Sequence, residues 1–121
     1  MNLLYRFEDD ICIITVEGEL VIEQIKKFKA YATKLVPNNK GLVLNLNAVN
    51  FIDSAGIGAV MWSAKEAKQK KQEFAVCNTS DIVDDIFRSM GLYTMFSIFD
   101  TETKALHHIT EKLSKFSSYT I

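Results

Sequence analysis

The sequence lacks the features that mark several specialised classes of protein. Its 121 residues include only two cysteines and one proline, and no apolar run approaches the roughly 18 residues that a transmembrane helix needs. Lys and Arg number 14 against 15 Asp and Glu, so the basic surplus of a nucleic-acid-binding protein is missing. Acidic residues 8–10 interrupt the N-terminal segment before the apolar core of a signal peptide could form. We therefore expect one globular, cytoplasmic domain over residues 1–121, with no nucleic-acid or membrane partner.

The two cysteines are typical of core residues. Cys12 and Cys77 each lie in a short apolar stretch, and neither belongs to a C-x-x-C pair or a Cys/His cluster. We expect both to be buried, reduced thiols. A chain of this length can bury a core without disulfides, and we expect neither a metal nor a cofactor.

Hydrophobic periodicity predicts strands that alternate with helices, which is typical of an α/β fold. The predicted strands cover residues 3–7, 11–17, 42–46, 74–77 and 97–99. The predicted helices cover residues 21–35, 54–71, 80–90 and a final segment capped by Asp100 or Thr101. The nearly continuous apolar run at 42–46 indicates a strand that is buried on both faces of a parallel sheet. The order ββαβαβαβα therefore implies a mostly parallel central sheet with an N-terminal antiparallel hairpin and about four helices.

One segment, from Asn50 to Gly58, departs from this ordinary pattern. It follows the buried strand and opens a helix, which is where open α/β domains place their ligands. Asp53 or Ser54 is positioned to cap that helix. Gly56 and Gly58 lie inside the first turns, where each glycine costs up to about 1 kcal/mol relative to alanine. We infer that a partner, a phosphate or a packed strand approaches the backbone closely here.

From the residues alone, four interpretations of this segment stay open. Asp53 and Ser54 could form a helix cap and nothing more. A phosphate-binding loop would need the third glycine of a dinucleotide motif or the Lys-Ser/Thr ending of a P-loop, and both are missing. A serine hydrolase would need a G-x-S-x-G elbow, and its only histidines, His107 and His108, lie on the last predicted helix. In the fourth interpretation Ser54 is a phosphorylation site, where about −1.5 to −2 charges would repel an acidic or apolar partner without unfolding the helix.

Three motifs resemble the STAS domain family, most closely the stand-alone bacterial anti-sigma factor antagonists. Residues 51–58 (FIDSAGIG) are similar to the family's D-S-[ST]-G-[LI]-G block. Residues 18–20 (GEL) resemble its G-E-[LI]-D motif, and residues 90–92 (MGL) resemble its hydrophobic-x-G-L step. The resemblance covers nearly the whole chain and implies a single STAS-type domain.

The resemblance also implies a binding protein rather than an enzyme. In this family the serine directly after the aspartate is phosphorylated by a partner anti-sigma factor that is itself a serine kinase. The unphosphorylated antagonist binds the anti-sigma factor and frees a sigma factor, and a serine phosphatase restores this state. Carried to this sequence, Ser54 is the phosphoacceptor. The expected partner-binding residues are Glu19, Asp53, Ser54, Ala55, Gly56, Ile57, Gly58 and Trp62.

Two positions depart from the family pattern. Ala55 stands where the family has Ser or Thr, which removes a rival acceptor. Val21 replaces the aspartate of the G-E-[LI]-D motif and leaves the identity of the partner open. Because some STAS domains act without phosphorylation, the alternative function is a scaffold or ligand sensor in another signalling system.

The expected role of Trp62 comes from helical periodicity rather than from the resemblance. The core stripe of its helix is Ile57, Val60, Met61 and Ala64. Trp62 lies about 140° from this stripe at ~100° per residue, so we expect it to face outward. An exposed tryptophan is a plausible binding anchor. The alternatives are that it packs under a neighbouring helix or loop, or that it lies in a homodimer.

Overall fold

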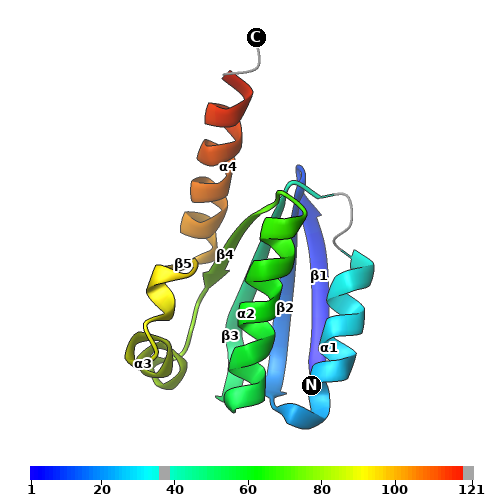
Figure 1. Cartoon of the computed structure of the whole chain (residues 1–121), viewed down its shortest axis with the longest axis vertical. Helices are drawn as coiled ribbons and strands as arrows, with labels where there is room; N and C mark the ends of the chain where they lie inside the picture. Colours follow the sequence, from blue (N-terminus) through cyan, green and yellow to red (C-terminus); the bar gives the residue numbers. More distant parts are fainter. Residues whose placement is uncertain (36–38, 119–121) are drawn as a thin grey trace.

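Five strands form a mixed sheet at the centre of the molecule (Figure 1). They are β1 (Asn2–Glu8), β2 (Ile11–Leu20), β3 (Gly41–Ile52), β4 (Glu73–Cys77) and β5 (Ser97–Phe99). This computed structural model describes residues 1–35 and 39–118. The strands lie in the order β1-β2-β3-β4-β5; β1 and β2 form the predicted antiparallel hairpin, and the other strands run parallel to β2. The predicted α/β fold is confirmed.

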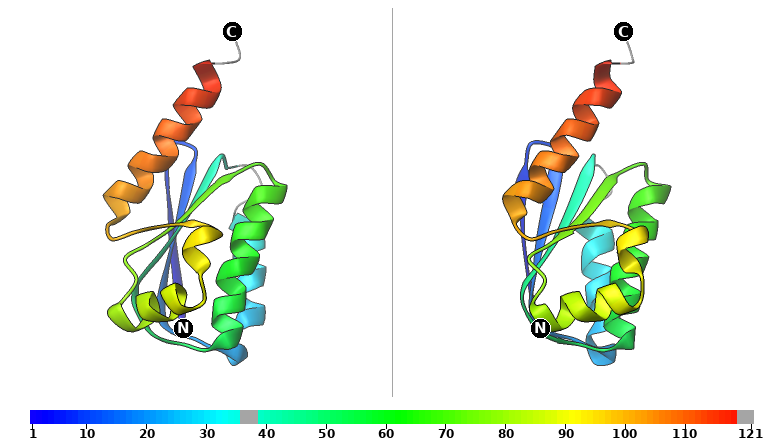
Figure 2. Two further views of the ribbon diagram at one scale, coloured as in Figure 1. Left: turned by 60° about the vertical axis from the view of Figure 1, so that its left-hand side comes forward. Right: turned by 90° about the vertical axis from the view of Figure 1, so that its left-hand side faces the viewer.

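Helices cover both faces of this sheet (Figure 2). They are α1 (Ile22–Leu35), α2 (Ser54–Gln69), α3 (Asp81–Ser89) and α4 (Glu102–Ser118), with a short 3-10 helix, η1 (Leu92–Thr94), before β5. On the face covered by α1 and α2, Phe28 and Val60 belong to one buried cluster with Leu44 of β3. On the opposite face, Ile109 of α4 belongs to a second buried cluster with Val43 of β3. As predicted, β3 is buried on both faces.

β3 is longer than the sequence pattern indicates. It continues to Ile52, beyond the predicted end at residue 46. The apolar run stops at Leu46, but the following residues keep pairing with β2, including Gly18 with Val49. Two register shifts between β2 and β3 accompany this extension. Strand pairing, rather than local hydrophobicity, therefore carries the chain to the start of α2.

The helix ends are set by individual residues. α2 ends at Gln69, two residues before the predicted end. Lys71, at that predicted end, has a left-handed φ of 58°. At the start of α4, the Lys104 N–H donates to the Thr101 Oγ1 at 3.2 Å, so Thr101 rather than Asp100 is the cap. Within the described part of the chain, no helix is long and apolar enough to cross a membrane.

Cys12 and Cys77 are buried, free thiols, as predicted. Burial disfavours the thiolate and raises the pKa to about 11 for Cys12 and about 12 for Cys77. Both side chains are therefore protonated packing residues at neutral pH.

Candidate functional site

Two strand-to-helix turns lie side by side at the carboxyl ends of the parallel strands. β2 ends at Leu20 and leads into α1, while β3 ends at Ile52 and leads into α2. The strand register pairs Glu19 with Phe51 and Leu20 with Ile52. The motif that contains Glu19 and the motif that contains Phe51 are therefore neighbours in space, at the edge where parallel sheets commonly bind ligands.

Asp53 joins these two turns through its carboxylate. Its Oδ1 accepts a hydrogen bond from the Gly56 N–H at 2.8 Å, and its Oδ2 accepts one from the Ile22 N–H at 3.0 Å. These bonds, first of all the one from Gly56, stabilise the ionised carboxylate and lower the pKa of Asp53. Of the two residues predicted as candidates for the cap of α2, Asp53 is the cap and Ser54 is not.

The same carboxylate explains how α1 begins without an aspartate at position 21. Val21 has no side-chain acceptor for the first N–H groups of α1, and Asp53 supplies one from the neighbouring turn. The Gln24 N–H donates to the Val21 carbonyl at 2.8 Å. One residue, Asp53, thus caps the starts of both helices.

Ser54 is the first residue of α2, and it is exposed. Within the described part of the chain its hydroxyl has no hydrogen-bond partner. The N–H groups of a first helical turn and the helix dipole favour negative charge at such a position. The hydroxyl is therefore accessible for modification, and its surroundings are compatible with a phosphate.

Gly56 and Gly58, in the first turns of α2, differ in the space around them. A Cβ at Gly56 would lie 2.0 Å from the Leu20 carbonyl oxygen, so only glycine fits between α2 and the end of β2. A Cβ at Gly58 would meet nothing within 4 Å, and this residue is exposed. Packing within the chain accounts for Gly56 and does not account for Gly58.

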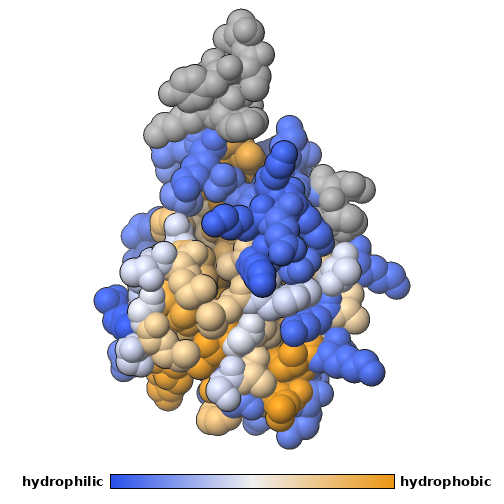
Figure 3. All heavy atoms as spheres, in the orientation of Figure 1, coloured by the Kyte–Doolittle hydropathy of each residue, from blue (hydrophilic) through white to orange (hydrophobic). Residues whose placement is uncertain are grey.

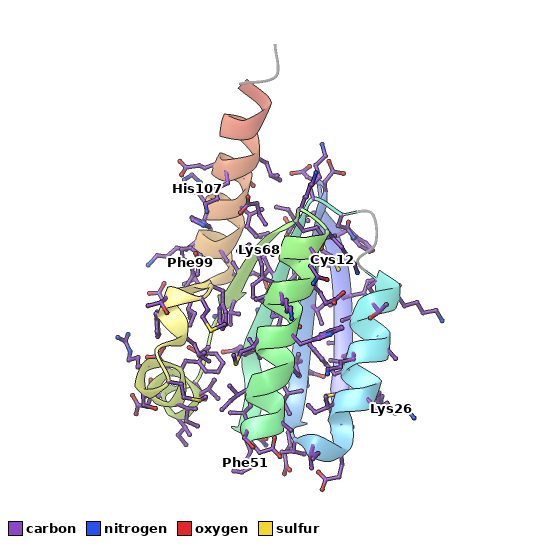
Figure 4. All side chains as sticks on the ribbon, viewed as in Figure 1. Cys12, Lys26, Phe51, Lys68, Phe99 and His107 are labelled. Carbon is purple, nitrogen blue, oxygen red and sulfur yellow. The ribbon has the colours of Figure 1, made fainter. Side chains whose placement is uncertain are left out.

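Two exposed apolar residues beside Ser54 were not predicted as part of the site. Phe51 is 55% exposed and Ile22 is 66% exposed. Figure 3 shows hydrophobic side chains at this end of the molecule, and Figure 4 labels Phe51 there. Ile22 is the first residue of α1, and at ~100° per residue it lies about 120° around the helix from the buried Phe28.

The other predicted partner-binding residues divide by exposure. Glu19 is exposed and Ala55 is half-buried. Ile57 is 6% exposed and belongs to the core cluster under α2. Ile57 and Gly56 can therefore shape the turn, but their burial keeps them from a direct contact with a partner.

The prediction that Trp62 faces outward is wrong. Trp62 is half-buried against the core, and Lys29 of α1 lies over its ring, with Nζ 5.4 Å from the centroid. The prediction placed the buried stripe of α2 through Met61, whereas Ser63 and Ala67 are buried too, because α2 packs against α1 as well as the sheet. The stated alternative, that Trp62 packs under a neighbouring helix, is what the structure has.

The serine hydrolase interpretation would need a histidine beside Ser54. His107 lies on α4, at the opposite end of the molecule from Phe51 (Figure 4). Its imidazole is paired with Glu111 at 3.2 Å. Among the described side chains, no group of three or more His, Cys, Asp or Glu is arranged to hold a metal ion.

Comparison with known families and proteins agrees with this fold. The STAS domain model matches residues 2–105, so the chain belongs to the STAS domain family. A relative from Paenibacillus polymyxa, named anti-sigma F factor antagonist, is 35% identical over 110 residues, which cover 88% of this chain and 94% of that protein. An anti-sigma-B factor antagonist of Staphylococcus aureus is 22% identical over 99 residues, 81% of this chain and 92% of that protein.

Solved structures share the fold. An anti-sigma factor antagonist from Mycobacterium paratuberculosis superposes with a TM-score of 0.82 at 20% identity, over 90% of this chain and 93% of that chain. The antagonist SpoIIAA in its unphosphorylated form gives a TM-score of 0.70 at 18% identity, over 90% and 98% of the two chains. The Bacillus SpoIIAA in its phosphorylated form gives 0.69 at 19% identity, over 89% and 99%.

Proposed function

We propose that this protein is a cytoplasmic anti-sigma factor antagonist whose binding to its anti-sigma factor is switched by phosphorylation of Ser54. The anti-sigma factor is the serine kinase, and a serine phosphatase reverses the modification. The observation that carries the proposal is the exposed, unbonded hydroxyl of Ser54 at the start of α2, directly after the capping Asp53. The name of the Paenibacillus polymyxa relative, which is 35% identical, supports the same function.

The surface that binds the unphosphorylated partner combines apolar and polar groups around Ser54. Phe51 and Ile22 are the exposed apolar residues, and aromatic residues at such positions commonly carry much of the binding energy. Gly58 presents bare backbone on the exposed side of α2, which lets a partner approach closely. Glu19 lies at the end of β2, opposite Phe51 in the strand register.

Phosphorylation ends this binding through charge and desolvation. The phosphate would stand next to the Asp53 carboxylate, whose lowered pKa keeps it ionised at neutral pH. A partner that covers Phe51 and Ile22 would then have to remove water from adjacent negative charges, which is strongly unfavourable without cationic partners. The fold itself persists, because the N–H groups of Gly56 and Ile22 stay bound to Asp53.

Labelling with radioactive ATP and the anti-sigma factor kinase of the same organism tests the proposal. Wild type should be labelled and Ser54→Ala should not. Ser80→Ala is the matched control, because Ser80 also stands at the start of a helix but its Oγ accepts from the Val83 N–H at 3.3 Å. Equal labelling of wild type and Ser54→Ala would contradict the switch. A stable complex with no labelling of Ser54 would indicate a scaffold that acts without phosphorylation.

A further inference from the structure

A second concave surface lies at the opposite end of α2 from Ser54. It is a groove of ≈ 670 Å³, which falls within the range of about 300–1,000 Å³ that is typical of small-ligand sites. Its walls come from the end of α2, the start of β4, the segment from η1 to β5, and α4. At 1.5 Å per residue, Lys68 in this groove lies roughly 21 Å along the helix from Ser54, so the groove is separate from the phosphorylation site.

The groove exists because β5 is shorter than β4. The register pairs Ala75 with Ser97, the first residue of β5, so Glu73 and Phe74 extend beyond the neighbouring strand. Phe74 is half-buried there and packs edge-to-face on Phe96, with ring centroids 5.6 Å apart. The floor of the groove is therefore aromatic.

The rim of the groove is positively charged. Lys68, Lys71 and Lys112 line it, against a single carboxylate from Glu73. Lys112 lies 3.8 Å from that carboxylate. Among the described side chains, Lys68 and Lys71 have no ion pair, and both are exposed. In Figure 3, hydrophilic side chains gather over the C-terminal end of α2 beside a hollowed area of hydrophobic ones.

An exposed apolar side chain completes the surface. Met95 is 55% exposed and borders the groove next to Phe96. Methionine adapts its shape to varied apolar ligands. The groove thus combines an aromatic floor, a methionine at its edge and the unpaired ammonium groups of Lys68 and Lys71. These features match a molecule with an apolar body and an anionic end.

We propose that this groove binds a small amphiphilic carboxylate, with the carboxylate on Lys68 and Lys71 and the apolar chain against Phe74, Phe96 and Met95. The ligand is a free molecule rather than a lipid in a bilayer, because the aromatic floor lies in a recess whose walls come from α2, β4, the segment before β5 and α4. The charge of the rim selects an anion, and the floor selects a chain over a compact ion such as phosphate. The proposal is independent of the switch at Ser54.

Calorimetric titration of the full chain with decanoate tests this proposal. We expect a dissociation constant below about 100 μM and at least about tenfold weaker binding of uncharged decanol. The variant Lys68→Glu/Lys71→Glu should lose affinity by at least about tenfold, because both changes lie on exposed side chains and reverse the charge of the rim. The matched control is Lys26→Glu/Lys27→Glu, an equal change of charge on exposed residues of α1, where Figure 4 labels Lys26.

Three results would overturn the proposal. One is the absence of binding up to about 1 mM decanoate. Another is an equal loss of affinity in the two double variants, which would indicate only a general effect of charge. The third is binding to vesicles of anionic lipid without binding to free decanoate, which would assign the surface to a membrane. Circular dichroism of both variants verifies that they are folded.

Discussion

The carboxylate of Asp53 ties the start of α1 to the start of α2, and this leaves the Ser54 hydroxyl without a structural task. Residue types alone predict that one of these neighbours caps the helix, because both accept hydrogen bonds at N-cap positions. They do not predict which one, since the bond to Ile22 depends on the pairing of β2 with β3. The residue that supports the fold and the residue proposed for modification are therefore separate.

Replacing Asp53 tests this division of roles. We expect Asp53→Asn to lower the melting temperature by several degrees at about pH 7, because an amide offers one oxygen to the N–H groups of Gly56 and Ile22. Ser54→Ala is the matched control and should melt with wild type. Thermal denaturation followed by circular dichroism measures both.

The pH dependence of the same variant gives an independent check. The pKa of Asp53 lies below its ordinary value of 3.8, so its contribution to stability is complete above that value. It is lost as the pH falls through the folded-state pKa. The difference in melting temperature between wild type and Asp53→Asn should therefore shrink from about pH 7 to about pH 3, and a constant difference would contradict the capping role.

The two glycines give opposite predictions for the same substitution. Gly56→Ala should unfold or severely destabilise the protein, because its Cβ would meet the Leu20 carbonyl oxygen. Gly58→Ala should raise the free energy of unfolding by about 0.5–1 kcal/mol, because alanine favours the helix and meets no neighbour. It should nevertheless weaken binding of the anti-sigma factor. Urea denaturation and calorimetric titration separate the two effects, and a destabilised Gly58→Ala would contradict the open space seen at this position.

At the scale of the elements, local patterns predict the five strands and the four α-helices, but not the short η1 and not all of the ends or faces. The apolar run at 42–46 predicts the centre of β3, whereas the pairing of residues up to Ile52 with β2 sets its end. Periodicity predicts one buried stripe on α2, whereas contact with α1 adds a second direction of burial that includes Trp62. The exposure of Phe51 depends on where β3 ends, and the apolar run at 42–46 does not predict that end.

Phe51 and Trp62 belong to different surfaces, and their alanine variants should separate them. Phe51→Ala should weaken binding of the anti-sigma factor by at least about tenfold while the melting temperature stays close to that of wild type. Trp62→Ala should cost about 2 kcal/mol of stability, since it removes a half-buried aromatic group between α1 and α2. If Trp62→Ala instead left stability intact and abolished binding, Trp62 would be a binding anchor rather than a packing residue.

At the scale of the whole molecule, the effect of a phosphate on Ser54 depends on the net charge of the chain and on where Ser54 lies. The chain carries a net charge of −1, and a phosphate would add about −1.5 to −2 at one point of its surface. That point lies at the apolar end of the molecule, away from the lysine-rimmed groove at the other end of α2. The near-zero net charge argues against nucleic acid as a partner. Against that net charge of −1, the charge of a single phosphate is a large change at the surface that a protein partner would bind.

The most direct test of the central claim compares the affinity of the anti-sigma factor for the protein with and without phosphate on Ser54. Calorimetric titration with the two forms should show at least about a hundredfold weaker binding of the phosphorylated one, while their melting temperatures differ by a few degrees at most. Equal affinities of the two forms would contradict the account. So would a phosphorylated form that fails to bind because it has unfolded.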